Sequence, residues 1–309
     1  MIYLILSVIC GALFSVVFKI CQEHDVNTQQ VILFNYVTAA IVNMAPVAFS
    51  ITISGDTQLG DYLLPIESYC LSALQGLFFV LGFTVMNIST WRNGVALTTI
   101  SARASLILPV ILSWLILSQS MPSWLSVILI VISMALLILP NEQQACSSST
   151  YTTSGKTHKR KAAIALVGVF FFYGIADFSM KLVQQSVAST FDDAQLISYK
   201  LTALTALIFI MASIISLITC VFSGCFKTNP VNWRSILGGI ILGAINLGCT
   251  SGMVRALNEM STSLFYPLYN IGIVLIATIV GASFFKEKIK WLQLIGVVMA
   301  IVAIALFFI

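Results

Sequence analysis

Long apolar stretches alternate with short polar connections along almost the whole chain. A helix needs about 20 mostly apolar residues to cross a membrane, and ten stretches have roughly that length. We therefore predict ten membrane-spanning helices, at residues 2–20, 29–50, 66–89, 95–117, 123–139, 162–181, 194–222, 235–255, 261–285 and 291–309. These stretches are apolar on all sides and do not alternate with polar positions, which favours helices over the strands of a membrane barrel.

The second half of the chain repeats the pattern of the first half. The third to fifth predicted helices match the eighth to tenth at an offset of 167 residues, which places Asn270 on Arg103 and Gly243 on Gly76. The second helix matches the seventh at an offset of 163, and the first matches the sixth at 162. Because each half holds an odd number of helices, the second copy must enter the membrane from the opposite side, as in many secondary transporters.

The repeat defines the expected domain organisation. Residues 1–140 form the first five-helix repeat, and residues 162–309 form the second. Between them, residues 141–161 are rich in Ser and Thr and end in a basic cluster, which is typical of a flexible linker. The predicted fold class is an all-α membrane protein with ten transmembrane helices arranged as two inverted five-helix repeats.

The composition supports a lipid environment and narrows the function. Of the 309 residues, 59% are hydrophobic and 8% are charged, whereas soluble domains carry about 25% charged residues. The net charge of +4 is therefore not interpreted as a nucleic-acid binding surface. The seven cysteines form no CxxC pair, and the two histidines lie in polar loops. We expect no metal, no cofactor and no enzymatic activity.

The distribution of Lys and Arg predicts an orientation. Eleven of the 15 fall in one set of alternating loops and only two in the other set. The positive-inside rule places the first set in the cytoplasm and both termini outside. The expected location is the cell (inner) membrane, crossed several times, and the first apolar stretch is expected to remain as a helix because no basic residue precedes it.

Charged and polar side chains inside the apolar stretches are the candidate site. An ionisable group at the centre of a membrane helix costs about 2.5–3.5 kcal/mol, so those that persist are usually functional or paired. Arg103 and Thr99 share one face of the fourth helix, and their counterparts on the ninth helix are Asn270 and Tyr266. Both halves thus aim a polar pair at one centre. The alternatives are that Arg103 reaches to the membrane surface or pairs with a structural carbonyl, and that Tyr266 belongs to an interfacial belt.

Asp177, Lys181 and Lys200 also carry charge within predicted helices. Asp177 lies four residues before Lys181, so it either pairs with that lysine or titrates as a proton-coupling carboxylate. Lys200 lies about two turns into the seventh helix, where it either faces a cavity or reaches to the interface. The complete predicted substrate-binding set is Arg103, Thr99, Tyr266, Asn270, Lys200, Tyr199, Gln75, Asn246 and Tyr36, with Asp177 as the proton-coupling candidate.

The eighth predicted helix carries a different signal. Its four glycines, Gly239, Gly243, Gly248 and Gly252, form two GxxxG spacings. Small residues at this spacing let helix backbones approach closely, so we predict tight helix packing there rather than a ligand site.

A family resemblance adds to this interpretation. Residues 281–288 (GASFFKEK), followed by Gln293 and Gly296, are similar to a signature of the drug/metabolite transporter superfamily, specifically its EamA-like family. Residues 263–269 (SLFYPLY) resemble the opening of that family's ninth helix, whereas residues 118–120 of the first half (Ser-Gln-Ser) depart from the pattern. The resemblance implies secondary transport of small metabolites through a central cavity. It also implies cytoplasmic termini, the reverse of the charge-based orientation.

The expected function follows from these charges and the repeat. Two buried cations, Arg103 and Lys200, outnumber the single buried acid Asp177, which favours an anionic or zwitterionic solute such as an amino acid, organic acid or sugar phosphate. We expect alternating-access transport in the direction of export, by a monomer or homodimer whose partners are a small-molecule substrate and the lipid bilayer, with no nucleic acid. The alternative is a flippase for a lipid-linked sugar or isoprenoid phosphate.

Overall fold

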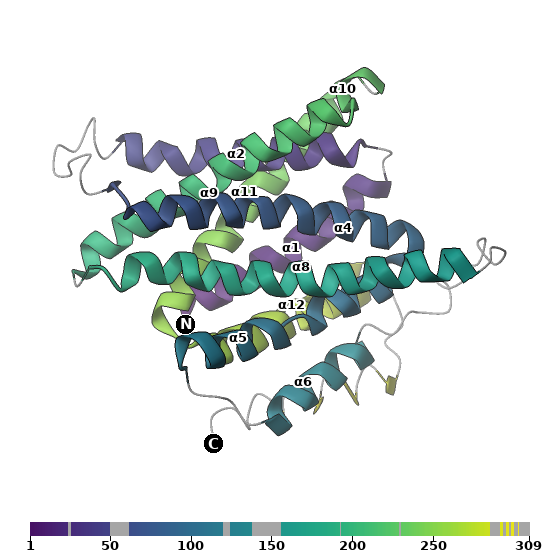
Figure 1. Cartoon of the computed structure of the whole chain (residues 1–309). Coiled ribbons are helices and arrows are strands. Elements are labelled where there is room, and N and C mark those ends of the chain that lie inside the picture. The colour runs from purple at the N-terminus through teal and green to yellow at the C-terminus, as the bar shows by residue number, and fades with distance from the viewer. Residues whose placement is uncertain are drawn as a thin grey trace. The chain divides into compact units, whose positions relative to one another are not determined.

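The structure is a computed structural model that describes residues 1–23, 26–49, 62–119, 124–137, 156–191, 193–228, 230–284, 291–292, 295–296, 298–299 and 302. The described residues form helices and contain no strand (Figure 1). The helices are α1 (Ile2–Glu23), α2 (Thr28–Phe49), α4 (Ile66–Ala104), α5 (Ile107–Leu117), α6 (Trp124–Leu137), α8 (Lys156–Ala188), α9 (Ala194–Phe222), α10 (Cys225–Thr228), α11 (Trp233–Glu259) and α12 (Thr262–Phe284).

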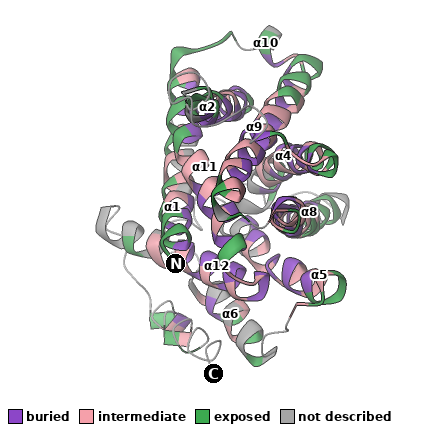
Figure 2. Cartoon of the chain, turned by 90° about the vertical axis from the view of Figure 1, so that its left-hand side faces the viewer, coloured by how far each residue is buried: buried purple, intermediate pink, exposed green. Residues whose placement is uncertain are grey.

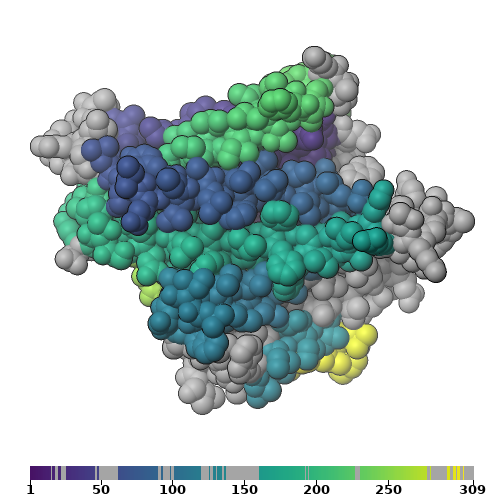
Figure 3. All heavy atoms as spheres, viewed as in Figure 1, coloured from purple at the N-terminus to yellow at the C-terminus, as the bar shows by residue number. Residues whose placement is uncertain are grey.

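Among the residues that the structure describes, four segments are long enough and apolar enough to cross a membrane, namely Ile66–Ser89, Arg160–Ala188, Gln195–Phe222 and Trp233–Glu259. The outer face of α9, the green band at the top of Figure 3, shows how such a helix meets its surroundings. Large apolar side chains are exposed there at helical spacing, at Ile214, Leu217, Ile218 and Val221. An exposed apolar stripe of this kind suits contact with lipid. The fold is thus that of an all-α membrane protein.

The predicted connection at residues 90–94 is helical instead, because α4 continues from Ile66 to Ala104. A helix interior accommodates Asn and Gly at a cost of about 1 kcal/mol or less each, and no proline interrupts this segment. The helical ladder breaks later, before α5. There the Leu108 N–H donates to the Ser105 carbonyl over 2.9 Å, and the next residue, Pro109, has no N–H to donate. The prediction of a break was correct in kind, but its position was wrong.

The predicted linker at residues 141–161 overlaps a helix at its C-terminal end. Helix α8 begins at Lys156, so the basic cluster at 156–161 is helical, while residues 138–155 lie outside the described residues. Lys and Arg are good helix formers and extend an apolar helix readily. The tenth predicted helix and the basic turn at 286–290 also lie almost entirely outside the described residues, so the ten-helix arrangement stays a prediction.

Two compact units divide the chain. Unit 1 comprises Met1–Val80 and Ser179–Met260, and unit 2 comprises Leu81–Phe178 and Ser261–Ile309. Each unit takes helices from both halves of the sequence, and α4 and α8 contribute one part to each unit. The predicted repeats are defined by sequence offsets and the units by contacts, so the repeat boundaries stay a prediction.

Unit 1 is built around α11, which packs against α1 and α2, while α2 also packs against α9. In Figure 2 these helices turn buried residues toward one another. A Cβ atom on Gly239 would overlap the Phe34 side chain of α2, and one on Gly243 would lie 2.6 Å from the Asn35 carbonyl oxygen. Close packing at the glycines is therefore confirmed, because only hydrogen fits between these backbones.

The other two glycines of α11 face a different helix. A Cβ atom on Gly248 would lie 2.9 Å from the sulfur of Cys10, and one on Gly252 would lie 2.9 Å from the Tyr3 carbonyl oxygen, both on α1. Helix α2 thus packs against the first glycine pair, and helix α1 packs against the second pair. One helix with two small-residue faces holds unit 1 together.

Unit 2 is built around α12, which packs against α5 and α6. Helix α8 joins this unit through Gly174, where a Cβ atom would lie 2.7 Å from the Leu108 Cβ atom of α5. Pro267 lies inside α12, which runs through it from Thr262 to Phe284. The proline lies early in the helix and removes only the hydrogen bond that its own nitrogen would donate. Tyr266 and Asn270 on either side of it therefore stay in one helical register.

Candidate functional site

A hydrogen bond between two side chains of unit 2 joins Arg103 to Asn270. The Arg103 Nη1 atom donates a hydrogen bond to Asn270 Oδ1 over 3.0 Å. Asn270 is buried and donates in turn from Nδ2 to the Tyr266 carbonyl oxygen over 3.0 Å. The amide is therefore held on both sides and its orientation is fixed. Two of the predicted site residues, from helices far apart in sequence, are brought together.

Tyr266 ties the same cluster to α8. Its hydroxyl donates a hydrogen bond to the backbone carbonyl oxygen of Asp177, and its side chain is fully buried. The Tyr266 ring meets Phe265 edge to face at a centroid distance of 5.2 Å, and Phe265 stacks on Tyr269 at 5.4 Å. Burial and a bond to α8 place this tyrosine inside the protein, so the alternative of an interfacial belt position does not apply to it.

Asp177 is half-buried, and it is the backbone, not the side chain, that receives the Tyr266 bond. The carboxylate interacts electrostatically with Arg103. Of the two alternatives for Asp177, pairing with Lys181 does not match the contacts of that lysine. The Lys181 ammonium instead donates to Gln184 Oε1 over 2.7 Å and to the Leu257 carbonyl oxygen over 2.8 Å. Two neutral oxygens satisfy most of its donors, so the lysine needs no carboxylate.

Tyr173 on α8 is a further polar residue that interacts with this group. Its hydroxyl donates to the sulfur of Met86 over 2.7 Å, and it interacts electrostatically with both Arg103 and Asp177. The signal was its spacing of four residues before Asp177. We call these five side chains the unit 2 polar cluster: Arg103, Tyr173, Asp177, Tyr266 and Asn270. Thr99 lies one turn before Arg103 on α4, but its side chain is not among those that the structure describes.

Lys200 and Tyr199 lie near the start of α9, in unit 1. The buried Lys200 Nζ donates to the Leu63 carbonyl oxygen over 2.6 Å and lies 4.3 Å from the ring centroid of Phe191. The Tyr199 ring lies 5.5 Å from that of Tyr62. Both side chains thus anchor the start of α9 to the segment that precedes α4. These contacts favour a structural role over substrate binding.

The remaining predicted site residues of unit 1 each contact different partners. Gln75 Oε1 accepts from the Ser179 hydroxyl, and Asn246 Nδ2 donates to Asn35 Oδ1 over 3.2 Å. Tyr36 is fully buried between the rings of Phe79 and Phe209, at 6.4 Å from each. No metal-binding group of three or more His, Cys, Asp or Glu occurs within the described ranges.

Comparisons with known proteins agree with the fold. No protein-family model matches the chain. An uncharacterized protein of Haemophilus influenzae is 27% identical over 308 residues, covering 97% of this chain and 95% of the relative. A protein of known crystal structure matches 99% of this chain and 94% of its own, with a TM-score of 0.71 and 9% sequence identity. A likeness at that identity shows the fold alone.

Proposed function

We propose that this protein is a secondary transporter of the EamA-like family within the drug/metabolite transporter superfamily. It resides in the inner membrane as ten helices in two inverted five-helix repeats. By alternating access it exports a small anionic or zwitterionic metabolite, such as an amino acid, an organic acid or a sugar phosphate. The observation that carries this proposal is the hydrogen bond between Arg103 and Asn270.

The two ends of that bond are counterparts in the repeat. Arg103 and Asn270 are 167 residues apart, the same offset that aligns the third to fifth predicted helices with the eighth to tenth. In two copies related by a two-fold axis, a residue contacts its own counterpart only close to the axis. The bond therefore supports a pseudo-two-fold axis at this point. In inverted-repeat transporters the substrate binds near the bilayer midplane at the interface of the repeats.

Close helix approaches within each unit support the same relationship. In unit 2, a Cβ atom on Gly82 would lie 3.7 Å from the Tyr173 ring. The repeat offsets carry this pair to Cys249 and Gly11. In unit 1 the close approach is between Gly248 and Cys10, each one residue before the counterpart that the offset gives.

A second pair of approaches matches in the same way. A Cβ atom on Gly168 would lie 3.1 Å from the Val85 side chain in unit 2. The offsets carry Val85 to Gly252 and Gly168 to residue 6. In unit 1, a Cβ atom on Gly252 would lie 3.1 Å from the Ser7 Cβ atom, again within one residue. Corresponding helix pairs thus approach at corresponding heights, as two copies of one packing unit should.

The chemistry of the unit 2 polar cluster suits an anion. Arg103 engages Asn270 with one N–H group, which leaves other guanidinium donors for a carboxylate or phosphate group. In a low-dielectric site, such charge-assisted bonds are stronger than neutral ones. Asp177 competes for the same cation when it is ionised. Protonation of Asp177 frees Arg103 for substrate, which couples proton movement to transport.

Transport by the purified protein in liposomes tests the proposal. We would measure movement of labelled L-alanine, succinate and glucose 6-phosphate, one from each proposed class. The Arg103→Gln variant is compared with Arg234→Gln, which removes an exposed arginine of α11. We expect one class to be carried by the wild type and by Arg234→Gln, and at least about tenfold less by Arg103→Gln. Equal transport by both variants would contradict the role of Arg103, and movement of an isoprenoid phosphate without solute transport would favour the flippase.

A further inference from the structure

Unit 1 contains a cavity that sequence reasoning did not identify. It has a volume of about 160 Å³ and lies where the start of α1, the first turns of α9 and the end of α11 meet. Its lining consists of Tyr3, Ile197, Ser198, Leu201, Arg255, Asn258 and Glu259. Every one of these residues belongs to unit 1 and none to the unit 2 polar cluster, so the cavity is distinct from the proposed transport site.

Arg255 is held in place at this cavity by neighbouring helices. Its Nη2 atom donates to Thr202 Oγ1 over 2.9 Å, and Thr202 Oγ1 donates to the Ser198 carbonyl oxygen over 3.0 Å. Its Nη1 atom makes a longer bond of 3.4 Å to the Ser251 carbonyl oxygen. The guanidinium is half-buried, yet no carboxylate pairs with it in the part of the chain that the structure describes. A fixed, unpaired cation with unused donors lines the cavity.

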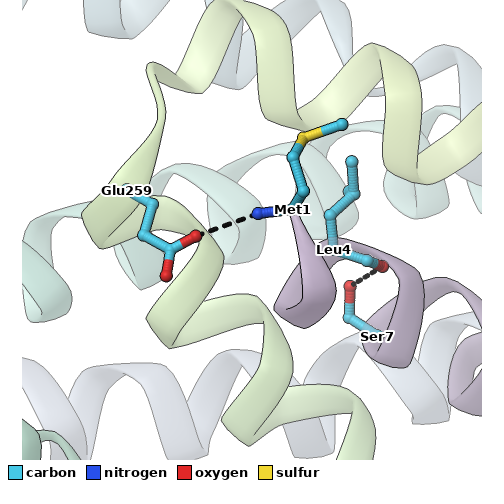
Figure 4. A network of polar contacts seen from close by, with 4 residues as sticks. All are labelled: Met1, Leu4, Ser7 and Glu259. Atoms are coloured by element: carbon cyan, nitrogen blue, oxygen red, sulfur yellow. Dashed lines mark hydrogen bonds and ion pairs between the residues drawn. The ribbon is translucent and has the colours of Figure 1, made fainter.

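The other polar side chains of the lining add donors. Asn258 Oδ1 accepts a hydrogen bond from Gln184 Nε2 over 2.9 Å, which orients the amide and leaves its NH₂ group available. Ser198 contributes an exposed hydroxyl. Glu259 brings the one carboxylate, but its Oε2 atom is engaged by the Met1 ammonium at 3.0 Å (Figure 4). The cavity is therefore rich in hydrogen-bond donors, and its one acid pairs with the Met1 ammonium rather than with Arg255.

We propose that this cavity, the Arg255 subsite, binds a small solute through its carboxylate group. Arg255 receives the carboxylate, and the Asn258 amide and Ser198 hydroxyl supply further hydrogen bonds. Drug-sized ligands occupy pockets of about 300–1,000 Å³, so the smaller volume here suits a solute of a few carbon atoms. Isoleucine and leucine on the remaining wall, Ile197 and Leu201, accommodate its short apolar part.

Direct binding tests the Arg255 subsite without any transport assay. N-acetylglycine carries one carboxylate and no ammonium, and glycine methyl ester carries an ammonium and no carboxylate. We expect N-acetylglycine, but not the ester, to raise the melting temperature of the detergent-solubilised full chain. The affinity should fall at least about tenfold in Arg255→Gln and stay unchanged in Arg234→Gln, a surface change on the same helix.

A second variant keeps the test informative if Arg255→Gln does not fold. Asn258→Asp retains an oxygen acceptor for Gln184 but replaces the amide donor with a negative charge, so it should also weaken N-acetylglycine binding at least about tenfold. Arg103→Gln distinguishes the two sites, because the Arg255 subsite predicts that the stabilisation survives there.

Three results would overturn the Arg255 subsite. They are no stabilisation by N-acetylglycine, stabilisation that Arg255→Gln and Asn258→Asp leave intact, and stabilisation only by phosphatidylglycerol in nanodiscs. The last result would assign Arg255 to a lipid head group. A failure of transport by Arg103→Gln bears on none of them.

Discussion

The amide oxygen of Asn270 accepts a hydrogen bond from Arg103 at 3.0 Å, and the amide nitrogen donates one to the Tyr266 carbonyl oxygen, one helical turn earlier. An amide in this position orients the guanidinium without cancelling its charge. A carboxylate of nearly the same shape would do both. This difference separates the electrostatic role of Arg103 from its structural role.

Asn270→Asp should therefore abolish most anion transport, and it also removes the bond that the amide donates to the Tyr266 carbonyl oxygen. The new carboxylate would lie about 3 Å from the guanidinium and neutralise it, so we expect at least about a tenfold loss of carried anion. Asn270→Ala keeps the positive charge and loses the amide's bonds to Arg103 and to the Tyr266 carbonyl oxygen, so its loss of transport should be smaller. Liposome transport measures both variants, and an Asp variant as active as the Ala variant would contradict the electrostatic role.

Asp177→Asn should uncouple transport from the proton gradient. The Tyr266 hydroxyl bonds the backbone of residue 177, so this change leaves that contact in place. We expect substrate exchange between the two sides to persist at symmetric pH, whereas accumulation driven by a pH difference is lost. Flux measured with and without an imposed gradient checks this. Retained gradient-driven accumulation would exclude Asp177 as the coupling group.

Gly239→Ala should destabilise unit 1 by about 1–3 kcal/mol, because the added methyl group overlaps the Phe34 side chain and lies 3.1 Å from the Asn35 nitrogen. The matched control is Gly82→Ala. There the methyl group meets the Tyr173 ring at 3.7 Å, an ordinary contact, and Ala gains up to about 1 kcal/mol in helix propensity. Thermal unfolding in detergent should show a lower melting temperature for the first variant and an equal or higher one for the second. Similar shifts in both would be inconsistent with tight packing at Gly239.

Lys200→Met should lower stability but leave solute preference unchanged. The lysine bonds the Leu63 carbonyl oxygen and packs over Phe191, and loss of a buried charged hydrogen bond costs about 1–3 kcal/mol. The expected readout is a lower melting temperature with an unaltered ratio of anionic to cationic solute in transport. A changed ratio would instead indicate that Lys200 contributes to substrate binding.

The positions of most helices were predictable from the sequence, because a membrane helix needs a minimum apolar length and the chain supplies it repeatedly. The proximity of Arg103 and Asn270 was also predictable, since the repeat offset pairs them. The end of α4 was not predictable. It depends on which carbonyl oxygen lacks its usual hydrogen-bond donor because Pro109 has no N–H. Lys181 was misjudged for a related reason. Its acceptors include the Leu257 carbonyl oxygen of a distant helix, and backbone carbonyls leave no signal in a sequence.

The Arg255 subsite was beyond sequence reasoning in the same way. It needs the ends of α1, α9 and α11 to meet, and the only local hint was that Arg255 and Glu259 are four residues apart. That spacing favours an ion pair on one helix. The structure instead gives each residue a partner on another segment, which is what leaves the cavity open.

The contact between Cys10 and Gly248 has an experimental consequence. A Cβ atom at position 248 would lie 3.8 Å from that of Cys10, which is the usual separation across a disulfide. Replacing Gly248 by cysteine would thus staple α1 to α11 with a single mutation, under oxidising conditions and reversibly. A protein whose two helices move as one body would keep working when stapled, and one whose helices slide would stop until a reductant is added.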